Sequence, residues 1–562
     1  MNSPRSILFI AFLVVTFFLY QSWMMETAPG TQPPQQQTNA ATNPNSDGIP
    51  SASPMASAVG PEQASAVPEA TDSATPAPTS VTSSTRVRVI TDVLDVLIDT
   101  QGGDVVNAQL RDFAQEQDSS ARFELLHADP NQLYVAQSGL VGANGTDSAS
   151  GRPIFYVEQT EYELTGHTIE VPLSYIAQDG TEYEKVFVFK RGSYAIDVRY
   201  DITNPTSEHK QMQFYAQLKQ VMTDASGSMM MPTYKGGAYS WDEDRYEKYA
   251  FDEMRDQRLN RATDKGWVAM LEHYFVSAWI PRSEGTKQLF SRVINGDQAI
   301  MGVLYPTTTV APNSQATINS TLFVGPKDQD AMAAVVENLD LTVDYGFLWW
   351  LAQPIFKLLQ FLQSFLINWG LSIIAVTIII KLLLYPLTKA QYVSMAKMRM
   401  IQPKLTALRE RYGDDRQKMS QAMMKLYKDE KVNPLGGCLP MLLQLPIFLS
   451  LYWVLLESVE LRHAPLFLWI DDLSAKDPYY ILPLLMGVSM WFMQKLQPSP
   501  ATDPMQQKLL QYMPVIFTVF FLWFPSGLVL YWLSNNLITI GQMQWIYSGL
   551  EKKGMMEKRK KK

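Results

Sequence analysis

A single positive charge, Lys381, stands within a long apolar run that covers residues 370–388. At about 1.5 Å of rise per helical residue, it would lie roughly 16 Å from the start of a helix long enough to cross a bilayer. A lysine at that depth costs roughly 2.5–3.5 kcal/mol, so it needs a polar neighbour or water. Either its long side chain reaches the membrane surface near Lys389, or it is a cationic site in a hydrated cavity inside the membrane.

Amides and hydroxyls are expected at the depth of Lys381. Thr377 is one helical turn away on the same face, and Gln444 lies about as far inside the next apolar run. Three neighbouring polar residues occupy the middle of the last apolar run: Ser534, Asn535 and Asn536. The apolar runs have no acidic residue near mid-depth, although a proton relay or an ion-coupled transporter would use one. We therefore predict a hydrated groove that attracts acidic groups of a passing polypeptide.

Six apolar runs are predicted to cross the membrane, and the Lys and Arg residues between them indicate the orientation of the chain. The first has no small-residue cleavage site after it, which indicates an uncleaved signal anchor over 1–26. The second covers 370–388, and the third to sixth lie within 438–547. Lys and Arg are concentrated in 389–437 and in the basic tail 548–562. Both termini are therefore predicted to be cytoplasmic, with residues 25–369 on the outer side.

Two amphipathic segments flank the second run. Polar residues recur every three or four positions over 344–369, which predicts a helix lying on the outer membrane surface. In 389–437, two sets of apolar residues at helical spacing predict a cytoplasmic helical hairpin with a basic outer face. The sets are Met398, Ile401, Leu405 and Leu408, then Met419, Met423 and Leu426. The alternative is a solvated basic loop that only satisfies the orientation rule.

The outer part of the chain has two different compositions. Residues 27–85 are rich in Pro, Ser, Thr, Ala and Gln, which predicts a disordered tether. Residues 86–345 are acidic, with a net charge of about −15, and apolar residues alternate with polar ones, for example over 194–203. Period two is typical of half-buried strands, so a large all-β sandwich is predicted. Three tryptophans either form a platform for stacking sugars or belong to the core: Trp241, Trp267 and Trp279.

Residue types that carry catalysis or bind metals are scarce. Cys438 is the only cysteine, so an intrachain disulfide and a multi-cysteine metal site are excluded. The five histidines are not clustered, and no nucleophile or paired-carboxylate motif is found. We predict that the protein is not an enzyme, that it uses no cofactor or metal, and that it has no DNA partner.

Four motifs resemble the YidC membrane protein insertases, a family with mitochondrial and chloroplast relatives. They are YPLTKAQ at 385–391, NPLGGC at 433–438, DPMQQK at 503–508 and FPSGL at 524–528. The match covers about residues 345–550, and the tethered outer domain with its uncleaved anchor resembles the Gram-negative form. The resemblance implies six transmembrane helices with a five-helix core in the bacterial inner membrane. It also implies that 86–343 forms a periplasmic β-supersandwich.

The resemblance also implies a mechanism and partners. Lys381 takes the position of the groove cation, which is usually an arginine; lysine keeps the charge but lacks the planar five-donor fork. The client's apolar segment would slide into lipid along the third and fifth spans. The residues expected on this client slide are Leu445, Phe448, Phe520, Tyr531 and Trp532. The expected partners are nascent membrane proteins, the Sec translocon and membrane lipids. The hairpin and basic tail would contact ribosomes and signal recognition components.

These observations predict an insertase and membrane chaperone that moves newly synthesised proteins into the inner membrane. Two alternatives remain open at the level of sequence. The first is a membrane-anchored protein that binds or modifies carbohydrates, whose acids would be Asp242, Glu243 and Asp244. The second is a small-solute transporter. Neither alternative accounts for both the loop hairpin and a membrane cation without an acidic partner.

Overall fold

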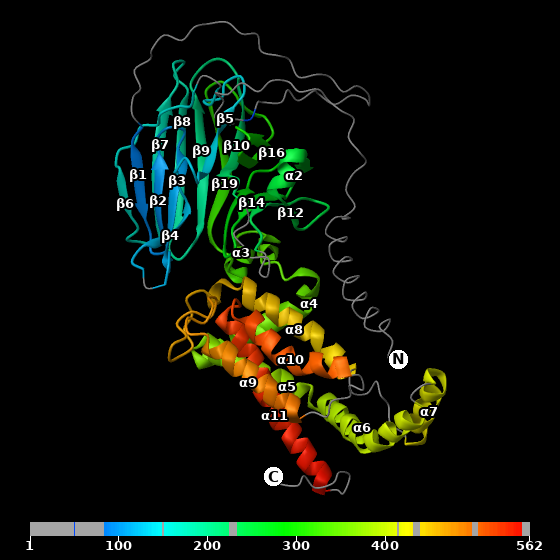
Figure 1. Cartoon of the computed structure of the whole chain (residues 1–562). Coiled ribbons are helices and arrows are strands. Elements are labelled where there is room, and N and C mark those ends of the chain that lie inside the picture. Colours follow the sequence, from blue (N-terminus) through cyan, green and yellow to red (C-terminus); the bar gives the residue numbers. More distant parts are fainter. Residues whose placement is uncertain are drawn as a thin grey trace. The chain divides into compact units, whose positions relative to one another are not determined.

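The computed structural model describes residues 50, 84–117, 119–148, 151–223, 233–412, 415–430, 439–496 and 504–552 (Figure 1). The chain forms two compact units that divide between Val343 and Asp344. Several predicted segments lie outside the described residues: the anchor 1–26, nearly all of the tether 27–85, the motif at 433–438 and the end of the basic tail.

The unit before the division contains two β-sheets. In the described residues, the larger sheet has the strand order β13 (Asn260–Thr263), β16 (Lys287–Ile294), β17 (Gln298–Leu304), β10 (Lys210–Val221), β5 (Tyr134–Val141), β3 (Asp104–Ala114), β2 (Leu94–Asp99), β1 (Arg86–Ile90) and β6 (Glu161–Glu163). Two further strands pair with β3 and β10, respectively: β4 (Arg122–Leu126) and β18 (Thr308–Val310). The smaller sheet has the order β12 (Glu247–Tyr249), β11 (Gly236–Ser240), β14 (Trp267–Leu271), β15 (Phe275–Pro281), β19 (Ser314–Pro326), β9 (Ala195–Asn204), β8 (Glu182–Lys190) and β7 (Thr168–Ile176).

The two sheets pack face to face, and the period-two pattern explains why. Along β9, alternate residues are buried, and the buried apolar side chains are Ile196, Val198, Tyr200 and Ile202. The β9 side chains meet the other sheet, because the ring of Tyr200 lies 5.6 Å from that of Phe214 on β10. The predicted all-β sandwich is therefore confirmed. Three short helical segments complete this unit: α2 (Phe251–Asp256), α3 (Gln329–Val335) and the 3-10 turn η1 (Leu339–Thr342).

Two of the three tryptophans belong to this core. Trp267 and Trp279 are fully buried, and their indole N–H groups donate to the carbonyls of Glu337 and Gln217 at 3.3 and 3.1 Å. A sugar cannot stack on a ring that is already enclosed by protein. The stacking platform is therefore wrong, and the core interpretation holds for both residues. The third indole, Trp241, donates to Asp244.

A cluster of charges lies inside the sandwich and joins the two sheets. Arg152 donates from Nε to Asp147 at 2.8 Å and also forms an ion pair with Asp104. Burial alone would lower the pKa of the Arg152 guanidinium, but the negative charges of Asp104 and Asp147 raise it well above its ordinary value. Lys185 on β8 donates to the carbonyls of Gly102, Gly103 and Ser138 at 2.7–3.0 Å. Burial lowers the pKa of Lys185 to about 7.

The unit after the division is helical. Its elements are η2 (Gly346–Leu348), α4 (Trp349–Leu366), α5 (Trp369–Leu383), α6 (Tyr385–Tyr412), α7 (Arg416–Asp429), α8 (Leu439–Glu457), η4 (Val459–Leu461), α9 (Ile481–Leu496), α10 (Pro504–Phe521) and α11 (Ser526–Lys552). Considered singly, none of the described helices has the length and hydropathy required to cross a bilayer. The pair Trp369–Leu383 and Tyr385–Met398 meets both requirements together, with a bend of 65° between them. The number of spans stays a prediction.

The bend corrects the predicted uninterrupted run over 370–388. Helix α5 begins with Asn368 as its N-cap, whose side chain accepts from the Leu371 N–H, and it ends at Leu383. Pro386 has no N–H to donate to the carbonyl of Leu382, and its ring crowds that carbonyl. Lys381 therefore lies in the last turn of α5, although the sequence placed it near the middle of a straight helix.

The loop 462–480 between η4 and α9 accepts hydrogen bonds from the starts of two helices, α5 and α11. Asn368, next to α5, donates from its side-chain amide to the carbonyls of Pro465 and Leu466 at 3.1 and 2.7 Å. At the start of α11, Ser526 and Gly527 donate their backbone N–H groups to the carbonyls of Ala475 and Leu473 at 2.7 and 2.8 Å. All four acceptors are backbone carbonyls of the loop.

The predicted helical hairpin is present as α6 and α7, which extend away from the other helices of this unit (Figure 1). Ile401 and Leu405 form its buried seam. The residues packed against this seam are Met398, Met423, Leu426 and Tyr427. The helix α4, within the predicted surface segment 344–369, presents large exposed apolar side chains, including Trp349, Trp350, Phe361 and Phe365. An apolar face of this kind suits a helix at a membrane surface.

Candidate groove in the helical unit

Lys381 is enclosed by protein on most sides and has no acidic partner. Its exposed fraction is 6 %, and in the described part of the chain no carboxylate lies within ion-pair distance of its ammonium. Thr377, one turn earlier on α5, is also buried, and its hydroxyl donates to the Ile373 carbonyl at 2.7 Å. The α5 part of the predicted site is therefore a buried cation one turn from a hydroxyl. That hydroxyl already donates its hydrogen bond to a backbone carbonyl of α5.

The amides on α11 divide between two neighbouring helices. Asn535 accepts from the side-chain amide of Gln444 on α8 at 3.1 Å. Asn536 donates instead to the hydroxyl of Ser489 on α9 at 3.0 Å. Consecutive helical residues point about 100° apart, so the two asparagines cannot face the same neighbour. Ser534, the last predicted member, is buried on α11. The structure thus links the polar residues in pairs across helices and does not join all six directly.

Two residues of this polar network were missed at the sequence level. Gln542 on α11 donates from its side-chain amide to the backbone carbonyl of Lys381 at 3.1 Å. Ser489 accepts from Asn536. Gln542 lies seven residues beyond Asn535 and so falls outside the predicted polar group in the middle of the last apolar run. That spacing is itself a signal, because seven residues are two helical turns and keep both side chains on the same side of α11.

The residues predicted for the client slide include an aromatic stack. The ring of Phe448 on α8 lies 4.6 Å from Trp532 and 6.1 Å from Tyr531, both on α11. Trp532 also lies 5.1 Å from Phe521 on α10. Tyr531 is buried beneath the apolar surface predicted for the client slide and packs against Phe448, so it can support this surface but is not exposed on it. Leu445 and Phe520 are exposed and present the apolar surface itself.

The arrangement can bind and orient a polypeptide, but it has no group placed for covalent chemistry. Within the described ranges, no three His, Cys, Asp or Glu side chains are grouped so that they could hold a metal ion. What the site offers is one cation, several amides and an adjacent aromatic surface. Such a combination suits noncovalent recognition of a chain that is polar in one segment and apolar in the next.

Comparisons with known proteins identify the family. Residues 86–358 match the family described as "YidC periplasmic domain", and residues 361–553 match "60Kd inner membrane protein". A relative from Vibrio atlanticus (strain LGP32), named "Membrane protein insertase YidC", is 52 % identical over 99 % of this chain and 100 % of its own length. A relative with the same name from Shewanella baltica (strain OS195) is 54 % identical over 99 % of this chain and 100 % of its own length. A solved structure described as "Active YidC insertase crystal structure with the first transmembrane domain resolved" shares 21 % identity, with a TM-score of 0.36 over 83 % of this chain and 93 % of that one. From the full-length relatives, the chain belongs to the YidC family.

Proposed function

We propose that this protein inserts newly synthesised proteins into the inner membrane of a Gram-negative bacterium, without catalysing a chemical reaction. Support comes from the full-length relatives above 50 % identity, which are named as membrane protein insertases. Its substrates are nascent membrane proteins. The sandwich is the periplasmic domain, six helices cross the membrane, and both termini are cytoplasmic. The basic hairpin and tail face ribosomes and signal recognition components, and the membrane part works alone or beside the Sec translocon.

The observation that carries the proposed mechanism is a buried lysine without an acidic partner. An isolated ammonium is costly to remove from water, so Lys381 requires water or a ligand beside it. A hydrated groove provides both, because it admits water and draws in the acidic outer segment of a client. The groove is bounded by Thr377 on α5, Gln444 on α8, and Ser534 and Asn535 on α11. Asn536 was also predicted there but bonds Ser489 on α9.

The apolar part of the client then moves along the neighbouring slide. Leu445 and Phe520 contact it, and the stack of Phe448, Tyr531 and Trp532 supports the surface. Burial of apolar area supplies the free energy at about 25 cal/mol per Å². Each large apolar side chain of the client therefore gains about 1.5–3 kcal/mol, and a full transmembrane segment outweighs the transfer of a few polar groups. No nucleotide or cofactor is required.

The test compares four proteins with two clients in reconstituted vesicles: wild type, Lys381→Arg, Lys381→Ala and Lys381→Glu. The clients differ only in whether the outer segment carries acidic residues or their amides. An ion pair at 4 Å contributes about 1 kcal/mol in water and about 4 kcal/mol at an effective dielectric constant of 20. We expect Lys381→Ala to lower insertion of the acidic client at least about five-fold relative to the amide client. Lys381→Glu should lower it further, and Lys381→Arg should retain it.

The matched control is Lys389→Ala, which removes an exposed lysine eight residues along the chain. It should leave the ratio between the two clients unchanged. Equal insertion of both clients by all four proteins would exclude a role for the charge.

A further inference from the structure

The C-terminal part of α11, residues 542–550, contacts the chain on both sides of the 65° bend between α5 and α6. On the α5 side, Gln542 donates to the carbonyl of Lys381 at 3.1 Å. At the bend, the ring of Trp545 stacks on that of Tyr385, with centroids 5.4 Å apart and planes at 28°. On the α6 side, the rings of Tyr547 and Tyr392 meet edge to face at 5.8 Å. One short stretch of α11 therefore touches the last turn of α5 and the first turns of α6.

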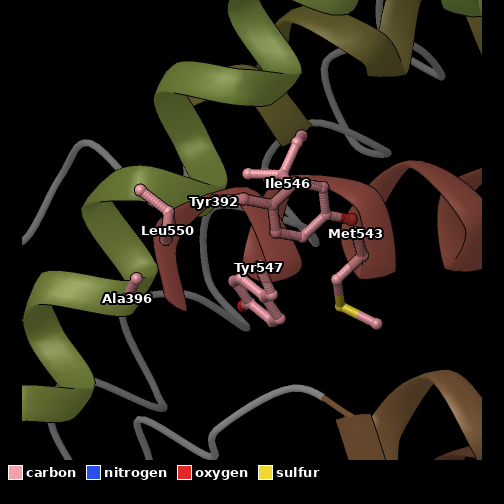
Figure 2. Close-up of a cluster of buried hydrophobic side chains, with 6 residues drawn as sticks. All are labelled: Tyr392, Ala396, Met543, Ile546, Tyr547 and Leu550. Atoms are coloured by element: carbon pink, nitrogen blue, oxygen red, sulfur yellow. The ribbon is translucent and has the colours of Figure 1, made fainter. Parts of the chain in front are cut away.

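The contact on the α6 side is a closed apolar cluster (Figure 2). It joins two residues of α6 to four of α11, all of them buried: Tyr392, Ala396, Met543, Ile546, Tyr547 and Leu550. Figure 2 shows the Tyr392 ring directed from α6 toward Met543 and Ile546 on α11. Tyr385, Val393, Met395 and Leu496 pack around the outside. A cluster that excludes water at the base of a hairpin resists rotation of α6 about the bend, because rotation would expose these side chains.

Gln542 is the point at which this cluster region meets the groove. Its side chain is buried, and its amide nitrogen bonds the backbone of the residue that carries the cation. Its Oε1 is also buried and has no hydrogen-bond partner among the described atoms. A buried amide acceptor without a partner is costly, so this oxygen is available to groove water or to a cation. The amide thus ties α11 to the Lys381 backbone and leaves one acceptor free beside it.

We propose that residues 542–550 of α11 form a clamp that fixes the bend between α5 and α6. The clamp sets the position of the Lys381 side chain in the groove and, through the same surface, the direction of the cytoplasmic hairpin. Gln542 acts through Lys381 and is a positioning residue. Its effect on client choice rests on the groove mechanism proposed above, whereas its effect on hairpin direction does not.

The first experiment measures client choice with the full-length protein in reconstituted vesicles. Gln542→Met keeps the length of the side chain but removes the N–H donor, and Gln544→Met is the control on the exposed face of the same helix. We expect Gln542→Met to lower the ratio of acidic-client to amide-client insertion about two- to ten-fold, the effect of one hydrogen bond. Gln544→Met should leave the ratio unchanged. A purely structural defect would lower insertion of both clients equally and would overturn the positioning role.

The second experiment measures the direction of the hairpin without any client. Spin labels at Met424 on α7 and Leu484 on α9, both exposed, report their separation in a Cys438→Ser background. The distance distribution should be narrow for the parent protein and for Tyr392→Phe, which keeps the ring. It should broaden for Tyr392→Ala and for Ile546→Ala, which open the cluster from opposite sides. Unchanged distributions in both alanine variants would refute the clamp.

The two experiments separate failure of the clamp from failure of the groove mechanism. If Lys381→Ala leaves the client ratio unchanged while the alanine variants broaden the distances, the clamp holds and the groove mechanism fails. If Lys381→Ala changes the ratio while Gln542→Met and the distances show no effect, the clamp fails and the groove mechanism holds.

Discussion

Replacing Arg152 by methionine should destabilise the β-sandwich far more than the same change at an exposed ion pair. The Arg152 side chain is 3 % exposed and bonds two acids, Asp104 and Asp147, as well as the carbonyls of Ser138 and Gly102 at 2.9 and 3.3 Å. Methionine fills similar space but donates no hydrogen bond. Two buried carboxylates would then lose the cation that both of them face.

The size of the effect follows from what remains bonded. Removing one partner of a buried ion pair typically costs about 3–5 kcal/mol. Both acids keep neutral donors. The hydroxyls of Tyr215 and Thr146 bond Asp147 at 2.7 and 2.9 Å, and the Gln137 amide bonds Asp104 at 2.8 Å. We therefore expect a loss near the lower end, about 3 kcal/mol, which is a large share of the 5–15 kcal/mol typical of a folded domain.

Hydrogen exchange of the full-length protein in detergent measures this loss within the sandwich alone. Amides of β8 and β9 lie next to the charge cluster, and a loss of about 3 kcal/mol should speed their exchange roughly 150-fold where exchange requires opening of the sandwich. The control is Arg88→Met, at a pair in which Arg88 is 48 % exposed and donates to Asp95 at 2.6 Å. Exposed pairs contribute about 0–1 kcal/mol, so exchange should rise less than about six-fold. Equal, small effects in both variants would refute the reasoning.

Two further predictions concern the same sandwich. Gly139→Ala would place a methyl group against the Asp147 carboxylate, which Arg152 and a tyrosine hydroxyl hold in place; a loss of about 1–3 kcal/mol is expected in the same exchange measurement, and no loss would show that the carboxylate moves freely. The second concerns acid: the hydrogen bond from Lys210 lowers the pKa of Asp179 to about 2. A lowered carboxyl pKa adds stability above the ordinary value near 4, and this stability is lost as the pH falls toward 2. Lys210→Met should remove this part of the acid sensitivity, worth at most about 1 kcal/mol because Asp179 is partly exposed, and unchanged acid unfolding would contradict it.

The sequence alone predicted the buried face of an element where a single periodicity determines which side chains are buried. Alternation in β9 predicted its buried face because a strand has only two faces, and the spacing of Ile401 and Leu405 predicted the hairpin seam because helix faces repeat every three or four residues. The charge cluster was not predicted. Arg152 pairs with Asp104, 48 residues away, and Lys185 bonds the carbonyls of Gly102 and Ser138 because the fold brings these distant segments together. No local sequence pattern encodes those contacts.

The sequence indicated the polar residues of the candidate site but not how they pair in space. Depth along a helix is one coordinate, from which Gln444 was predicted at the level of Lys381; the structure shows Gln444 bonded to Asn535 on α11. Rotation of each helix about its own axis is a second coordinate, which depends on packing. For that reason Asn536 bonds Ser489 on another helix. Pro386 could have indicated the end of α5 at Leu383, but the apolar run continues past it, so hydropathy alone predicted one uninterrupted helix.

The loop before α9 holds its neighbours through main-chain oxygens of Pro465, Leu466, Leu473 and Ala475. Because every residue type has such an oxygen, side chains at these four positions can change over evolution without loss of the bonds. The number of residues between them cannot change in the same way, since an insertion or deletion would move two oxygens away from Asn368 or from the start of α11. Orthologues should therefore differ in amino-acid sequence along this stretch while keeping its length.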